Sequence, residues 1–240
     1  MSPPIIMTEH FITKFQNLLS PEECADVITL FEGSSAHHPG RTGSGVDPSK
    51  KNSLDLNITK LEAWKPYRQV IEQRVMAALA NYVRSYPHLV TGAVAPSIID
   101  PQTSQPRSIT ASELTALNDQ TLSQIVHKIF RLDGFNMQRY SPQVGGYHHW
   151  HSEQFPHPND SAQRSLHRVL LVLIYLNDVT DGGATEFIHQ QVAIQPEAGS
   201  LLLAPCGFTH THRGLRSATQ TKYVLASWVM YQPAELLYAS

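Results

Sequence analysis

The sequence is poor in cysteine and shows no excess of either charge. Only Cys24 and Cys206 are present, which is too few for a disulfide framework or a thiolate zinc cluster. Charged residues make up 16% of the 240-residue chain, and 18 basic residues stand against 20 acidic ones. A protein dedicated to binding polyanions would carry a basic excess. We therefore expect no nucleic-acid partner.

Long apolar runs are also missing. No stretch approaches the ~18 consecutive apolar residues of a transmembrane helix. The N-terminal sequence MSPPIIMTEH lacks the basic and then apolar order of a signal peptide. We expect a soluble, cytoplasmic protein without a membrane partner, long enough for one elaborated domain with a real core. The sequence gives no indication of an oligomeric state.

The first half of the chain has helix signals. In LLSPEECADVITLFEG, the expected N-cap is Ser20, Glu23 completes a capping box, and Gly33 ends the helix. Apolar residues recur at spacings of three and four over 64–86 and over 112–130, which predicts two further helices.

Two long loops are expected between these helices. Gly33–Ser53 and Ala95–Ser108 are rich in Gly, Ser and Pro. The first of them, with Arg41 and the solvated charges of Lys50 and Lys51, is a candidate lid over a substrate. A plain surface loop is the alternative.

The second half changes to short β-type segments separated by turn sequences. These segments predict strands over Phe135–Tyr140, Val169–Leu176, Val192–Ile194, Leu201–Ala204 and Lys222–Val229. Seven or eight strands at this spacing indicate a mainly β, α+β protein, a sandwich or barrel with the helices packed outside it. We expect one domain over 1–240, with a helical N-terminal support region over 1–132 and the β core over 133–232.

Histidine is abundant where other reactive residues are scarce. Thirteen are present, with clusters in YHHWHSE and FTHTH. Side chains two apart on a strand share a face, so His151 can join Glu153, and His212 can approach them from another strand. Two imidazoles and one carboxylate form the facial triad of non-haem Fe(II) oxygenases. A His-x-Glu tripeptide alone is weak evidence because it also arises by chance.

Two other histidines compete for these positions. His149 shares a strand face with His151, although only His151 has the His-x-acid spacing. His210 competes with His212 because GSLLLAPCGFTH has the spacing of the second cupin motif. The first cupin motif is incomplete, since Gln143 stands where it requires glycine and Glu153 follows His151 too closely. A cupin-type, 2-oxoglutarate-independent metalloprotein therefore remains the rival interpretation.

Four segments together resemble a known family. They are MQRYSPQVGGYHHWHSE, RVLLVLIYLNDVTDGGATEF, PEAGSLLLAP and HRGLRSATQTKYVLASWV. In this order, over about 90 residues, they resemble the prolyl-4-hydroxylase-like branch of the 2-oxoglutarate and Fe(II)-dependent dioxygenases. The resemblance implies a double-stranded β-helix (jelly-roll) core. It also implies Fe(II) and 2-oxoglutarate as cofactor and co-substrate, dioxygen as a reactant and ascorbate as a candidate reductant.

The resemblance also implies roles for individual residues. His151, Glu153 and His212 would bind the metal, and Lys222 would bind the distal carboxylate of 2-oxoglutarate. Lys222 has an alternative role as an edge-strand charge.

Two tyrosines, Tyr140 and Tyr175, stand where relatives place tyrosines near the co-substrate. A half-buried core aromatic is the alternative for each.

Three departures from the family pattern are present. Glu153 stands where aspartate is usual, Arg216 and Ser217 replace Pro-Val, and Gln220 replaces a glycine. The ligands remain intact, so these departures bear on the substrate. The resemblance implies hydroxylation of a peptide, a free amino acid or another small molecule, with release of succinate and CO2. A non-catalytic ligand-binding barrel and a zinc hydrolase are the alternatives, and neither explains Lys222 at its spacing from His212.

Overall fold

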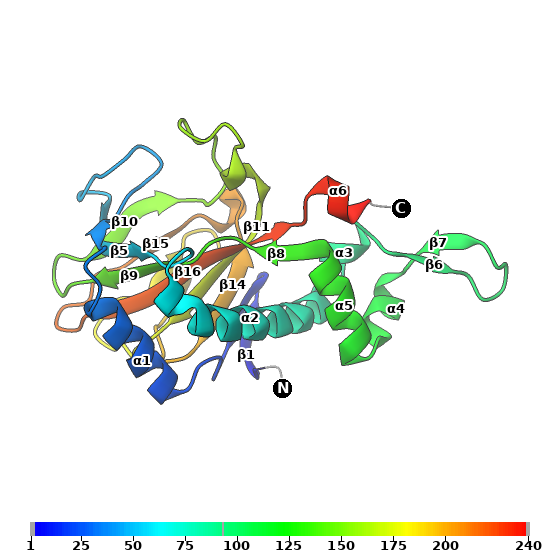
Figure 1. Ribbon diagram of the computed structural model, residues 1–240, viewed down its shortest axis with the longest axis horizontal. Coiled ribbons are helices and arrows are strands. Elements are labelled where there is room, and N and C mark those ends of the chain that lie inside the picture. The colour runs from blue at the N-terminus through cyan, green and yellow to red at the C-terminus, as the bar shows by residue number, and fades with distance from the viewer. Residues whose placement is uncertain (1–2, 93, 239–240) are drawn as a thin grey trace.

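Two antiparallel β-sheets form the centre of the protein (Figure 1), in a computed structural model that describes residues 3–92 and 94–238. The larger sheet has the strand order β1-β2-β14-β11-β16-β9-β5-β3, with β8 also paired to β16. Its strands are β1 (Ile5–Glu9), β2 (Ile12–Phe15), β3 (His38–Pro39), β5 (Leu54–Asn57), β8 (Phe130–Leu132), β9 (Asn136–Tyr140), β11 (Arg168–Tyr175), β14 (Leu201–Pro205) and β16 (Lys222–Tyr231).

The smaller sheet has the order β13-β12-β15-β10-β4. Its strands are β4 (Lys51–Asn52), β10 (Gly146–His151), β12 (Thr185–Phe187), β13 (Val192–Ile194) and β15 (His212–Gly214). All pairings in both sheets are antiparallel. Residues of the two sheets line one shared cavity, so the β core is the jelly-roll type of architecture that we expected.

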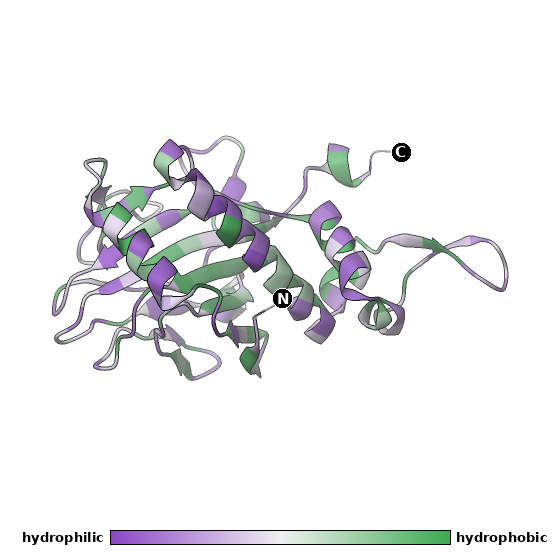
Figure 2. Cartoon of the chain, turned by 60° about the horizontal axis from the view of Figure 1, so that its bottom comes forward, coloured by the Kyte–Doolittle hydropathy of each residue, from purple (hydrophilic) through white to green (hydrophobic). Residues whose placement is uncertain are grey.

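The middle of the larger sheet is buried on both faces. Its strands β11, β14 and β16 are therefore almost continuously apolar, as in LLVLIY and LLLA. One face packs against the main helices, α1 (Pro21–Glu32) and α2 (Lys65–Ser85), and the other contributes to a second apolar cluster next to the cavity. Figure 2 shows the apolar strands beneath helices whose outward faces are hydrophilic.

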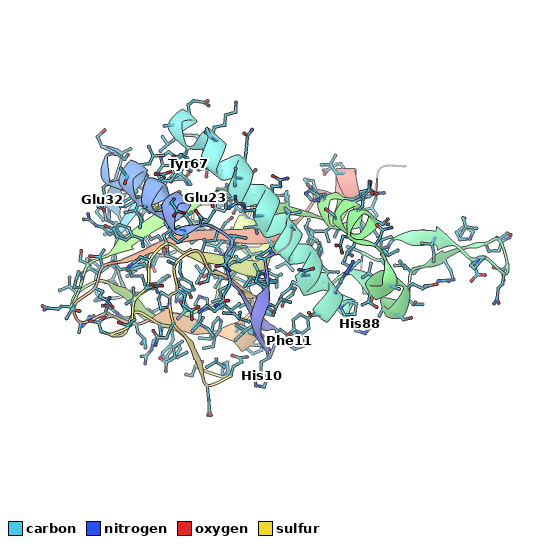
Figure 3. The ribbon with its side chains drawn as sticks, turned by 90° about the horizontal axis from the view of Figure 1, so that it is seen from below. His10, Phe11, Glu23, Glu32, Tyr67 and His88 are labelled. Atoms are coloured by element: carbon cyan, nitrogen blue, oxygen red, sulfur yellow. The ribbon has the colours of Figure 1, made fainter. Side chains whose placement is uncertain are left out.

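The predicted helix after Ser20 is confirmed in detail. Ser20 accepts from the Glu23 backbone N–H, while the Glu23 carboxylate accepts from the Ser20 backbone N–H. The same carboxylate binds Arg74 of α2, with a shortest N···O distance of 2.6 Å. Figure 3 shows the two helices side by side over the sheet, with Glu23 between them. One residue thus caps α1 and fixes it against α2.

The prediction of a single helix over 112–130 was wrong in one respect. The structure has two helices there, α4 (Ala111–Ala116) and α5 (Asp119–Ile129). The apolar periodicity continues across the break, but Asn118 adopts an extended conformation and its side chain accepts from the Thr121 N–H. An N-cap that begins a new helix overrides the periodicity. The remaining helices are short: α3 (His88–Thr91), α6 (Ala234–Leu237), η1 (Glu62–Trp64), η2 (Arg164–His167) and η3 (Phe208–His210).

The two predicted loops also contain strands. Within Ala95–Ser108, β6 (Ser97–Ile99) pairs with β7 (Pro106–Ser108) in a hairpin that projects away from the sheets (Figure 1). Within Gly33–Ser53, β3 pairs with β5 and β4 pairs with β10. The N-terminal region therefore adds strands to both sheets as well as the helices outside them. Backbone groups at open sheet edges need partners, and the first 57 residues provide them. The boundary at residue 132 stays a prediction.

The fold predicts a large cost for shortening one core side chain. Leu225 of β16 is fully buried in the main apolar cluster, so Leu225→Ala should lower the free energy of unfolding by about 2–5 kcal/mol in urea denaturation. Leu236→Ala is the matched control, because Leu236 is 60% exposed. Equal losses in the two variants would contradict this packing.

Candidate metal centre and its cavity

Two histidines and one glutamate converge at the paired ends of β10 and β15. His151 is the last residue of β10, His212 is the first of β15, and the two are direct partners across the sheet. The carboxylate atom Glu153 Oε1 lies 3.6 Å from His151 Nε2 and 3.3 Å from His212 Nε2. The three potential ligand atoms all lie within 4.8 Å of one another.

A β-bulge explains which histidine of β10 enters the site. Tyr147 pairs with Gly214 and His151 with His212, so four steps along β10 match two along β15. Consecutive N–H groups, those of His148 and His149, both donate to the Lys50 carbonyl. Strict alternation would place Tyr147, His149 and His151 on one face, but the bulge breaks it. Tyr147 and His151 line the cavity with stacked rings, and His149 does not line it.

His210 is directed away from the cluster. It ends the short helix η3, so it is not on the strand that carries His212. Its Nε2 contacts the His10 carbonyl at 2.9 Å, and its Nδ1 contacts the Thr209 hydroxyl at 3.0 Å. Both ring nitrogens are occupied by local partners, so the cupin alternative, which needs His210, is not favoured.

The protonation states suit metal binding. Burial opposes ionisation of Glu153, but hydrogen bonds from His151 and His212 outweigh it and hold the pKa of the carboxyl well below its usual range. Burial, together with the nearby His212, lowers the pKa of His151. A carboxylate and a neutral imidazole are the forms in which Glu153 and His151 can bind a divalent cation.

The donor set fits Fe(II). Adjacent ligands of an octahedral ion with bonds of about 2.1 Å are about 3 Å apart, close to the separations of Glu153 Oε1 from the two Nε2 atoms. Nitrogen and oxygen donors without thiolate are typical of non-haem iron sites with open coordination positions.

Glu153 is held on its outer side by the larger sheet. Its second carboxylate oxygen, Oε2, accepts from Trp228 Nε1 at 2.9 Å and from Arg168 Nη1 at 3.2 Å. The Arg168 guanidinium lies over the Trp228 ring, 3.5 Å from its centroid. Our sequence reasoning gave no role to either residue. The available signal was an arginine directly before the apolar run of β11.

A cavity of about 970 Å³ extends from these ligands and reaches Lys222. Lys222 is buried at the start of β16, where its Nζ donates to the Gly183 carbonyl at 2.6 Å. Gly183 has a φ of +68°, which favours glycine, and a Cβ there would lie only 2.7 Å from Val179 Cγ1. No carboxylate of residues 3–92 or 94–238 lies within ion-pair distance of Lys222. Burial lowers the pKa of this lysine to about 7.

Tyr140 and Tyr175, which we predicted to lie near the co-substrate, are on either side of Lys222. The centroids of the Tyr140 and Tyr175 rings are 5.8 and 5.4 Å from Lys222 Nζ. Tyr140 lines the cavity and its hydroxyl donates to Gln138 Oε1 at 2.8 Å. Tyr175 is fully buried behind the wall, with its hydroxyl 2.8 Å from the Thr185 hydroxyl. Thr185 rather than Tyr175 therefore faces the cavity.

The prediction that Lys51 is a solvated loop charge was wrong. Lys51 belongs to β4, is buried, and its Nζ lies 2.7 Å from Asp55 Oδ2. Asp55 also accepts from the Ser53 hydroxyl and from Asn136 Nδ2. The sequence KKNSLD shows no pattern that separates Lys51 from its exposed neighbour, because only the pairing of β4 with β10 carries Lys51 inward.

The comparisons with known proteins agree with this geometry. The sequence model of the 2OG-Fe(II) oxygenase superfamily matches residues 135–230. No curated protein matches the chain significantly.

Three solved structures have similar folds. The viral collagen prolyl hydroxylase of Paramecium Bursaria Chlorella virus-1, in its 2OG complex, is 17% identical, with a TM-score of 0.53 over 91% of this chain and 95% of the relative. A Pseudomonas putida prolyl-4-hydroxylase is 15% identical, with a TM-score of 0.55 over 93% and 94%. A Trichoplax adhaerens prolyl hydroxylase, in complex with a hypoxia inducible factor peptide fragment, is 16% identical, with a TM-score of 0.57 over 96% and 87%.

The chain matches the 2OG-Fe(II) oxygenase superfamily over the region 135–230, which contains the three candidate ligands and Lys222. It is a 2-oxoglutarate-dependent dioxygenase with a prolyl-hydroxylase-like jelly-roll core, and Fe(II) and 2-oxoglutarate are its cofactor and co-substrate. Among the described residues, no helix combines the length and the apolar character needed to span a bilayer.

The buried pair Lys51–Asp55 generates a stability prediction. Asp55→Asn would leave the Lys51 ammonium buried without a charged partner, so it should lower the free energy of unfolding by about 3–5 kcal/mol in urea denaturation. Glu186→Gln, which removes the half-exposed ion pair with Arg213, should cost less than about 1 kcal/mol. A small loss for Asp55→Asn would show that Lys51 reaches solvent.

Proposed function

We propose that His151, Glu153 and His212 bind the catalytic Fe(II) and that Lys222 binds the distal carboxylate of 2-oxoglutarate. The observation that carries this assignment is the presence, in one cavity, of a three-donor metal cluster and a buried lysine that has no carboxylate partner within the described part of the chain. A buried ammonium is costly unless an anion approaches it. The free carboxylate of a chelating keto acid would supply that anion.

The protein's own groups would orient the reactants. Tyr140 and Thr185 have hydroxyls at the cavity wall beside Lys222, where they can hydrogen-bond a carboxylate. The ring of Tyr147 stacks on His151, with centroids 3.6 Å apart, and keeps that imidazole in place. When bound together, iron and 2-oxoglutarate supply the oxidising power for hydroxylation of a C–H bond, with release of succinate and CO2.

We propose a peptidyl or free amino-acid substrate. The cavity volume exceeds what 2-oxoglutarate alone requires, and its lining continues outward along Arg41, Thr42 and Lys60. The Trichoplax relative is a complex with a peptide fragment, which supports the peptide within this pair. The predicted lid in Gly33–Ser53 contributes to this outer wall, and its closure stays a prediction, as do ascorbate as reductant and a cytoplasmic location.

We also propose that the whole chain forms a single domain. Strands from residues 5–57 complete both sheets, so the β core over 133–232 would not keep its edges without the N-terminal region.

Anaerobic addition of Fe(II) and 2-oxoglutarate to apo-protein should produce the weak visible charge-transfer band of a chelated keto acid. We expect the band to disappear in His212→Ala, which removes a ligand. In Lys222→Ala, which removes only the distal anchor, the band should form at roughly ten- to hundredfold higher 2-oxoglutarate concentration. His210→Ala is the matched control, because His210 bonds away from the cluster. A band lost in His210→Ala and kept in His212→Ala would make His210 the ligand, and no band in the wild type with metal still bound would support the cupin interpretation.

The affinity for 2-oxoglutarate should depend on pH through Lys222. Its pKa is about 7 in the free protein, and a bound carboxylate would raise it. Below pH 7 the lysine is already charged, so affinity should be flat. Above pH 7 binding must take up a proton, so Kd should rise by up to tenfold per pH unit until the pKa of the bound state is reached.

Calorimetry in buffers of different ionisation enthalpy, anaerobically and at saturating Fe(II), measures this proton uptake. We expect close to one proton at pH 8 and close to none at pH 6. Lys222→Arg is the control, because arginine stays charged throughout this range. An equal pH dependence in Lys222→Arg would assign the proton to another group.

A further inference from the structure

The carboxylate of Glu153 is surrounded by donors on two opposite sides. Its Oε1 faces the imidazoles of His151 and His212, and its Oε2 faces Trp228 Nε1 and Arg168 Nη1. The two oxygens therefore have different partners, although they are chemically equivalent. A carboxylate left free could bind a metal through one oxygen or through both.

The backbone of Glu153 is fixed as firmly as its side chain. Its N–H donates to the Cys206 carbonyl at 3.0 Å, and its carbonyl accepts from Arg168 Nη1 at 3.1 Å. Arg168 thus holds both the main chain and the side chain of one residue. The guanidinium stacks on the Trp228 ring, 3.5 Å from the ring centroid, and this contact fixes the orientation of the guanidinium. The result is a rigid Arg168–Trp228 clamp on Oε2.

We propose that Arg168 and Trp228 are positioning residues that hold Glu153 as a one-oxygen metal ligand. This inference rests on the proposed assignment of His151, Glu153 and His212 as the iron ligands. The clamp reserves Oε2 for hydrogen bonds, so only Oε1 is available to the metal. It thereby keeps three coordination positions open for the keto acid and dioxygen, where a two-oxygen carboxylate would occupy one of them.

The clamp also accounts for a glutamate at this position. Glutamate has one more rotatable bond than aspartate, so it loses more side-chain freedom when it is held as a ligand. Trp228 and Arg168 lie on adjacent strands of the larger sheet, β16 and β11, while Glu153 follows a strand of the smaller sheet. The longer side chain can therefore span from the ligand cluster to the opposite sheet. Partners of this kind commonly change metal affinity by about 10–100-fold.

The test is a double-mutant cycle on metal affinity, measured in apo-protein without turnover. Trp228→Phe keeps an aromatic ring under Arg168 and removes only the indole donor. We expect it to raise the Kd for Fe(II) at least tenfold. In Co(II)-loaded protein, it should also change the intensity of the d–d bands, because the released carboxylate can then bind through both oxygens.

The second arm of the cycle is Glu153→Asp. The shorter side chain places its carboxylate out of reach of Trp228, so adding Trp228→Phe to Glu153→Asp should change Kd by less than twofold. Multiplicative effects in the double variant would show that Trp228 acts through general packing and would overturn the proposal. Trp150→Phe is the matched control, since Trp150 also stacks on an arginine, Arg213, but bonds to none of the ligands.

The outcomes separate this inference from the proposed function. If the wild-type protein gives no charge-transfer band with Fe(II) and 2-oxoglutarate, the iron assignment itself fails. If the wild type gives the band but Trp228→Phe binds Fe(II) and Co(II) as the wild type does, only the clamp is wrong. Urea denaturation of each variant checks that a change in Kd is not caused by unfolding.

Discussion

The pairing of His151 with His212 across β10 and β15 is the constraint on which the rest of the site depends. Two imidazoles from distant parts of the chain become neighbours only in this register. A slip by one residue would turn each side chain to the opposite face of its strand. The bulge between Tyr147 and His151 sets the register locally, and the carbonyl of Lys50 holds it by accepting two consecutive N–H groups. Lys50, directly before the edge strand β4, thus supports the candidate metal site, although it is not a candidate ligand.

Charge is distributed along the cavity in a definite order. Arg168 neutralises the outer oxygen of Glu153 and Asp55 neutralises Lys51, whereas a carbonyl is the only polar partner of Lys222 among the described residues. Burying charges costs free energy unless each is paired. An anion that reaches the inner end of the cavity would therefore meet an ammonium that still lacks a charged partner.

The sequence predicted the parts of this site that short patterns encode. The His-x-Glu tripeptide follows from spacing along a strand, the roles of His212 and Lys222 are implied by the family resemblance, and the Ser20 capping box follows from local chemistry. Periodicity could not show where Asn118 interrupts a helix, because one capping side chain decides it. Burial of Lys51 and the approach of Arg168 to Glu153 were out of reach for another reason. Each depends on a contact between segments that only the closed sheets bring together.

Glu153 stands where the family pattern has aspartate, and this difference affects contacts on the opposite sheet. A longer ligand side chain moves the carboxylate away from its own strand, so the opposite sheet must control where it points. Trp228 lies on the same strand as Lys222, six residues further along. One strand therefore places both the candidate anchor of the co-substrate and a hydrogen-bond donor to the Glu153 carboxylate. A shift of β16 against the smaller sheet would move Lys222 and Trp228 together, while His151 and His212 would stay with β10 and β15. The distance between the candidate metal ligands and Lys222 thus depends on how the two sheets pack against each other.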